Sequence, residues 1–134
     1  MTVDYSTLAV GQEISNKSLV VDADAVARYV DAVGDGSGIF DPDGESPVVP
    51  AMAVAGMSLG GLVDDLGIPR DLVHVGQELE FKRAARVGEE LTSTAVLVQN
   101  SVREGSRFIG VRLSVRDGAG MAVMDGKSTM IMPA

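Results

Sequence analysis

The sequence predicts a single α+β domain in which antiparallel strands pack around a long apolar helix. Its first half carries two stretches in which apolar residues recur at helical spacing. Its second half alternates apolar and polar residues in segments separated by glycine turns, which is typical of strands. A length of 134 residues suits one hydrophobic core, so we expect one domain over residues 1–134.

The first helix is predicted between Asp22 and Gly34, after a short strand. Asp22 suits the N-cap because its carboxylate can accept hydrogen bonds from the first-turn N–H groups. Gly34 suits the end because glycine readily adopts the left-handed conformation found there. The residues that recur at three- and four-residue steps, and so form one apolar face, are Val26, Tyr29, Val30 and Val33.

The second helix is predicted to begin near Pro50 and to end at the segment "DLGIPRD". The apolar run over residues 47–63 is short for a membrane span, so we expect a buried core helix. Gly56 and Gly60 lie one turn apart, and either admit a close backbone or are merely tolerated gaps. The apolar residues expected on one side of this helix are Met52, Ala55, Leu59, Leu62 and Val63.

Four strands are predicted after this helix, joined as an antiparallel meander. They begin with the alternation in "QELEFKRAARVGEEL" and continue through "LTSTAVLVQN", "RFIGVRLSV" and "MAVMDGKSTMIM". The segment "RDGAG" between the last two is typical of a tight hairpin turn. A mostly apolar helix needs burial on several sides, and a curved sheet wrapped around it would provide that.

Composition excludes several classes of function. The net charge of −8 argues against nucleic-acid binding, which needs a basic face. Without cysteine there is neither a disulfide framework nor a thiolate metal site, and no other metal-ligand spacing is present. The lack of cysteine suits the reducing cytoplasm, which is where we expect the protein, and the N-terminal segment lacks the basic and apolar regions of a signal peptide.

The acidic loop "YVDAVGDGSGIFDP" precedes the apolar helix and is the candidate site. Carboxylates can act as acids or bases, and a helix N-terminus favours negative charge nearby. The aspartates of this loop that follow the predicted helix are Asp35 and Asp41. Each has a structural alternative, because Asp35 follows a helix-ending glycine and Asp41 precedes a proline, where aspartates commonly shape turns.

Several segments, taken in order, resemble the MaoC-type hot-dog dehydratases and (R)-specific enoyl-thioester hydratases. They are "VGQEI", "YVDAVGD", "VVPAM" and "HVGQELEFKRAARVGEEL". The resemblance implies a hot-dog fold, a long central helix wrapped by an antiparallel sheet, with domains or protomers paired into a larger sheet. It also implies an acyl-CoA or acyl-carrier-protein thioester as ligand. No separate cofactor is implied, since coenzyme A or phosphopantetheine enters as part of the substrate.

The resemblance also assigns roles to particular residues. The family uses an aspartate, a histidine five positions later, and a backbone N–H from a glycine that begins the central helix. In this chain these positions are Asp35, Phe40 and Ala51. Phe40 cannot exchange a proton, whereas Ala51 keeps its N–H. We therefore expect Phe40, Ala51 and Met52 to line the substrate site, and Asp41 is the carboxylate that could replace the histidine.

The remaining charged residues have less specific interpretations. His74, the only histidine, begins a predicted strand and is expected to be structural. Basic residues gather in the strand region, where they could meet coenzyme A phosphates or simply form a solvated sheet face. They are Lys82, Arg83, Arg86, Arg103, Arg107, Arg112 and Arg116.

These features predict an acyl-thioester-binding subunit of the dehydratase family that lacks the usual Asp/His pair. It is expected to form a homodimer or a heteromer with a second MaoC-like subunit. The alternative is an active enoyl-CoA hydratase or 3-hydroxyacyl dehydratase that uses Asp35 with a non-standard second residue. A more distant alternative is a thioesterase, but Asp64 and Asp65 lie too far along the central helix for the acid of that class.

Overall fold

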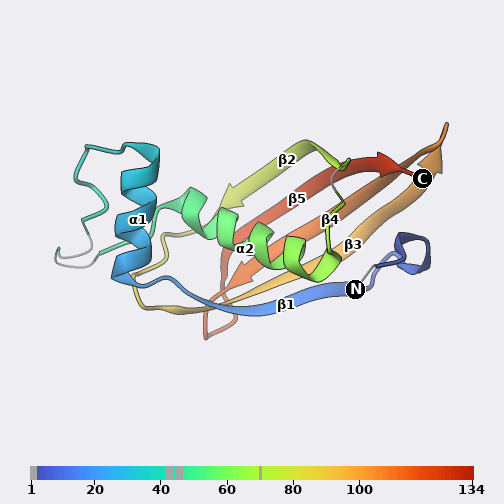
Figure 1. The fold of residues 1–134 in the computed structure, drawn as a ribbon. Helices are drawn as coiled ribbons and strands as arrows, with labels where there is room; N and C mark the ends of the chain where they lie inside the picture. The colour runs from blue at the N-terminus through green and yellow to red at the C-terminus, as the bar shows by residue number, and fades with distance from the viewer. Residues whose placement is uncertain (1–2, 42–43, 45–46, 70) are drawn as a thin grey trace.

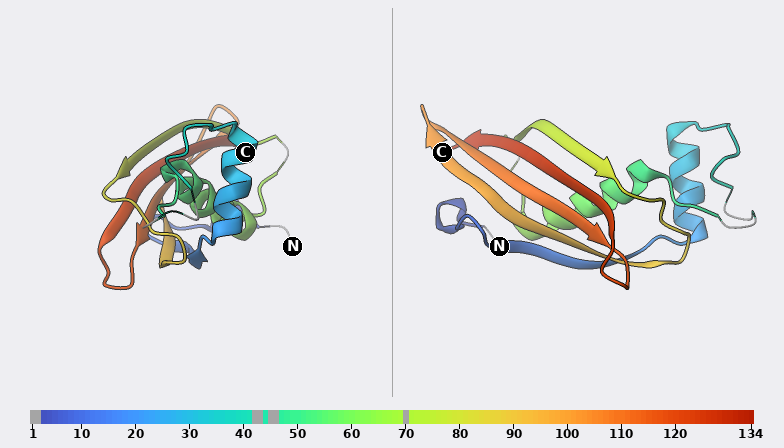
Figure 2. Two further views of the ribbon diagram at one scale, coloured as in Figure 1. Left: turned by 90° about the vertical axis from the view of Figure 1, so that its left-hand side faces the viewer. Right: turned by 180° about the vertical axis from the view of Figure 1, so that it is seen from behind.

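One antiparallel sheet curves around helix α2, Ala51–Leu66, in the computed structural model of the chain (Figure 1). The structure describes residues 3–41, 44, 47–69 and 71–134. Helix α1, Ala23–Val33, lies beyond one end of the sheet, and a short 3-10 helix, Tyr5–Thr7, precedes the first strand. Seen end-on in Figure 2, the sheet bends around α2. The expected α+β hot-dog architecture is thereby confirmed.

The sheet has five strands in the order β1-β3-β4-β5-β2. Their bounds are Glu13–Val20 for β1, Val73–Phe81 for β2, Glu90–Arg103 for β3, Ser106–Arg116 for β4 and Ala122–Pro133 for β5. The predicted meander is right for β3, β4 and β5, but wrong for β2, which pairs with β5 at the opposite edge from β1. With the meander in the middle, the two edge strands lie on either side of α2 (Figure 1).

The buried side of α2 differs from the predicted one. Met52 and Val63 were expected on the same side as Ala55 and Leu62 but are 52% and 37% exposed. The helix instead turns Ser58 inward, where its hydroxyl lies 2.7 Å from the Ser93 hydroxyl of β3. The spacing of apolar residues cannot predict that a serine is buried. The hydrogen bond between the two hydroxyls offsets the cost of burying them. The buried residues of α2 are Ala53, Val54, Ala55, Ser58, Leu62 and Leu66.

A side chain approaches α2 closely at a glycine that the sequence did not single out. Gly56 and Gly60 have open space around them, which favours the tolerated-gap alternative. At Gly61, by contrast, a Cβ would lie 3.2 Å from Cγ of Lys17 on β1. Lys17 also forms an ion pair with Asp65 at 3.0 Å, so β1 contacts the C-terminal half of α2 at both points.

The predicted boundaries of α1 are confirmed. The Asp22 side chain accepts a hydrogen bond from the N–H of Ala25 at 2.8 Å, as an N-cap should. Gly34 ends the helix with φ of 72°, in the left-handed region that favours glycine. The apolar run over residues 47–63 forms α2 and the segment before it, and no helix within the described ranges is long and apolar enough to cross a membrane.

Candidate active site

The start of α2 leaves backbone N–H groups without helical acceptors beside the loop where the site was expected. Pro50 is the N-cap and makes no side-chain hydrogen bond, while its carbonyl accepts from the N–H of Ala53 and Val54. The N–H groups of Ala51 and Met52 have no acceptor within the helix, because first-turn donors lack a preceding turn. Together with the helix dipole, they form a place where a developing negative charge would be stabilised.

Two pockets meet at Phe40. The first, of about 510 Å³, lies at the end of α1 and is lined by Asp35, Asp41 and Phe40 among others. The second, of about 330 Å³, lies at the start of α2 and is lined by Phe40, Ala51 and Phe81 together with small apolar residues. Phe40 belongs to both, so its half-buried ring lies between the carboxylates and the helix start.

Asp35 is held as a carboxylate by the loop that carries it. Hydrogen bonds from the side chain and the backbone N–H of Ser37, the latter 2.9 Å from Oδ1, keep the pKa of Asp35 below its ordinary value. At neutral pH the group is therefore in the form of a base rather than of an acid. The same hydrogen bond also shapes the loop, which agrees with the structural alternative that the sequence offered for Asp35.

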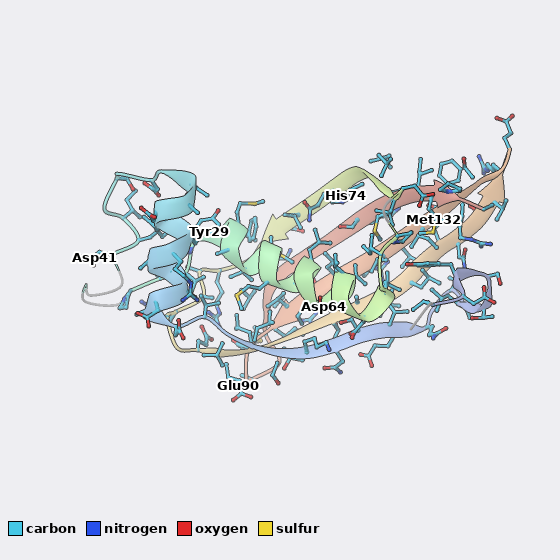
Figure 3. The ribbon with its side chains drawn as sticks, in the orientation of Figure 1. Tyr29, Asp41, Asp64, His74, Glu90 and Met132 are labelled. Atoms are coloured by element: carbon cyan, nitrogen blue, oxygen red, sulfur yellow. The ribbon has the colours of Figure 1, made fainter. Side chains whose placement is uncertain are left out.

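Met52 and Asp41 occupy different places from the helix-start pocket. Met52 lies in a separate groove of about 280 Å³ between α1 and α2, together with Tyr29 and Met57. Asp41 is exposed and lines the same pocket as Asp35, and Figure 3 places it far from His74 on β2. The predicted site residues are thus distributed over three neighbouring pockets, and the pair that shares the helix-start pocket is Phe40 and Ala51.

His74 lies where the sequence predicted, close to the start of a strand, and is exposed there. It pairs with Met130 of β5 and lines none of the three pockets described above. In the part of the chain that the structure describes, no group of three or more histidine, aspartate or glutamate side chains is placed to hold a metal ion.

The sequence did not reveal the environment of Arg83, which lines the helix-start pocket. Its guanidinium donates to the carboxylates of Glu89 and Asp117, the latter at 2.9 Å, and both raise the pKa of Arg83 above its ordinary value. Neighbouring Lys82 is paired with Glu80 at 2.6 Å. Lys82 and Arg83 are therefore already paired with carboxylates of this chain, which makes binding of coenzyme A phosphates by them less favourable.

A family model, described as FAS1-like, dehydratase domain region, matches residues 8–126. The chain belongs to this dehydratase family. The MaoC-like hot-dog resemblance of its sequence is thereby confirmed. Comparison with curated proteins found no significant match.

Solved structures of hot-dog enzymes are similar to this dehydratase-family chain over nearly its whole length. An (R)-hydratase from A. caviae involved in PHA biosynthesis has a TM-score of 0.79 and 25% identity, covering 95% of this chain and 98% of its own. The MaoC-like dehydratase from Rhodospirillum rubrum has a TM-score of 0.77 and 17% identity, covering 96% and 94%. The C-terminally truncated HadBC (3R-hydroxyacyl-ACP dehydratase) complex from Mycobacterium tuberculosis has a TM-score of 0.76 and 17% identity, covering 98% of this chain and 100% of its own. The last two show the fold alone.

Proposed function

We propose that this chain is a cytoplasmic acyl-thioester-binding subunit of the dehydratase family that lacks its own catalytic pair. The observation that carries the proposal is the position of Phe40, between the Asp35 pocket and the start of α2. In the family, according to the resemblance, a histidine occupies this position. A phenyl ring there neither accepts nor donates a proton.

Hydration of an unsaturated thioester needs a base for the water, an acid for the α-carbon and donors for the thioester oxygen. This chain retains one carboxylate, Asp35, and the N–H donors at the start of α2. It has no group at position 40 that accepts or donates a proton. The site is therefore equipped to bind and polarise a thioester, and deficient in proton transfer.

The ligand we propose is an acyl group on coenzyme A or on an acyl carrier protein. The helix-start pocket suits it, because mostly apolar side chains line the pocket together with Ala51, whose N–H would donate to the thioester carbonyl oxygen. The apolar residues are Phe40, Val48, Val49, Ala51, Val54, Phe81, Ala84, Ala85 and Val123. No cofactor beyond the carrier's own phosphopantetheine arm is part of this proposal.

The partner we propose is a second hot-dog chain, either another copy of this one or a MaoC-like subunit that carries the missing pair. The HadBC structure is named as a complex, which supports an assembly of this kind. An active hydratase that uses Asp35 with Asp41 is not favoured, since neither carboxylate lines the helix-start pocket that Ala51 lines. A thioesterase is not favoured either, because Asp65 is paired with Lys17 toward the far end of α2.

Binding of butanoyl-CoA tests the proposal directly. We expect the purified chain to bind butanoyl-CoA more tightly than free coenzyme A in isothermal titration. Ala51→Pro should weaken that binding by roughly 2- to 10-fold, because it removes one N–H donor. Proline is well tolerated at the first position of a helix, so α2 should remain intact. Ala51→Gly keeps the N–H and is the matched control. Equal binding by the proline and glycine variants would exclude this site.

A further inference from the structure

The connection between β2 and β3, residues 82–89, hydrogen-bonds to the segments in front of both helices. The N–H of Val49 donates to the carbonyl of Ala85 at 2.8 Å, directly before α2 begins. The N–H of Gly88 donates to the carbonyl of Val21 at 2.9 Å, directly before the cap of α1. A further hydrogen bond joins Val87 to Pro47 at 3.0 Å. The elements that carry the candidate site are thus anchored to this one connection.

Arg83, near the start of this connection, binds Glu89 at its end. Its guanidinium donates to the Glu89 carboxylate and, at 2.7 Å, to the carbonyl of Ala84. Glu89 in turn accepts the N–H of Arg86 at 3.0 Å. A planar guanidinium can hold two partners at fixed angles, which a lysine ammonium cannot do as well.

Asp117 joins the connection to the β4–β5 hairpin. One of its oxygens accepts from Arg83 at 2.9 Å, and the other accepts the N–H groups of Ala119 and Met121, each at 2.9 Å. The Asp117 side chain is 15% exposed and that of Arg83 35% exposed, so water competes only partly with their contact. The connection is therefore tied to the turn between two of the three inner strands of the sheet.

We propose that Arg83 is a positioning residue that holds the N–H donors of α2 in place. It acts through Ala85 and Val49, by fixing the connection against the hairpin, and its own charge is satisfied by two carboxylates. The effect on thioester binding rests on the proposed function, whereas the effect on the connection itself does not.

Hydrogen exchange and butanoyl-CoA binding, measured on the same variants, test this inference. In Arg83→Met, the amides of Val49 and Val87 should exchange roughly 10-fold faster or more, because hydrogen bonds to charged groups are lost. Exchange of the Leu113 amide in the core of β4 serves as the reference for any global loss of stability. Butanoyl-CoA binding should weaken in parallel, and Arg83→Lys should fall between the wild type and Arg83→Met.

Asp65→Asn is the matched control, because it removes an ion pair of α2 at the opposite end of the helix. It should leave the Val49 and Val87 amides and the binding unchanged relative to the reference. If Arg83→Met does not fold, Asp117→Asn, which leaves Glu89 in place, should give a smaller effect of the same kind.

Exchange at Val49 and Val87 that stays as in the wild type, or rises only in proportion to Leu113, would overturn the inference. Faster exchange at Val49 and Val87 with unchanged butanoyl-CoA binding would show that Arg83 holds the connection but does not affect the ligand site. If the wild type binds no thioester, the proposed function fails, and the exchange rates alone decide whether Arg83 holds the start of α2.

Discussion

Phe40→His should give the purified chain hydratase activity toward crotonyl-CoA. An imidazole at this position would lie between Asp35, which is held as a carboxylate, and the N–H groups at the start of α2. Restoring a general acid–base group is typically worth ~10²–10⁴-fold in rate. Loss of the enoyl-thioester absorbance measures the gain directly.

Two further variants identify the source of that gain. Asp35→Asn in the Phe40→His background should remove it, because the carboxylate is the expected partner of the histidine. Phe40→Asn is the matched control, since it replaces the ring with a polar group of lower volume that does not exchange protons at neutral pH. If the wild type already hydrates well and Phe40→His changes little, the chemistry uses other residues, and Asp41 is the first to test.

Val75→Lys should make the chain monomeric, whereas the wild type should assemble. Strand β2 forms one edge of the sheet and is exposed along nearly its whole length, with Val73 and Val75 57% and 50% exposed. An exposed apolar edge favours pairing with another strand, and a lysine on it disfavours that pairing. Light scattering at micromolar concentrations should report the wild type as larger than its 13.9 kDa monomer and the variant as the monomer.

Val20→Lys is the control for this experiment, because Val20 is 52% exposed on β1, at the other edge of the same sheet. It should remain assembled. A wild type that is monomeric throughout would contradict pairing altogether. Dissociation by Val20→Lys, with Val75→Lys still assembled, would place the contact at β1.

Local chemistry in the sequence predicted the elements well, and long-range pairing less well. Asp22 and Gly34 mark the ends of α1 because capping depends on neighbours in the chain. The pairing of β2 with β5 could not be predicted from the alternation of apolar and polar residues. That alternation indicates which face of the sheet a side chain lies on, and not which strand lies beside it. The inward turn of Ser58 was missed because its partner, Ser93, lies on another element.

The same distinction holds for the site. The loop pattern and the family resemblance together pointed to Asp35 and Phe40, which line one pocket. Met52 was expected beside them because it follows Ala51, yet successive residues of a helix point about 100° apart, and it lies in another groove. Glu89 and Asp117, the partners of Arg83, lie six and 34 positions away in the chain. The sequence pattern therefore did not predict these ion pairs.

The measurement that tests the central claim most directly is the rate of crotonyl-CoA hydration by the wild-type chain alone, then with a family subunit that carries the aspartate–histidine pair. We predict no hydration above the uncatalysed rate for the chain alone, and hydration on mixing that exceeds that of the added subunit. Turnover by the chain alone at about 1 s⁻¹ or faster, within the usual range of enzymes, would contradict the account.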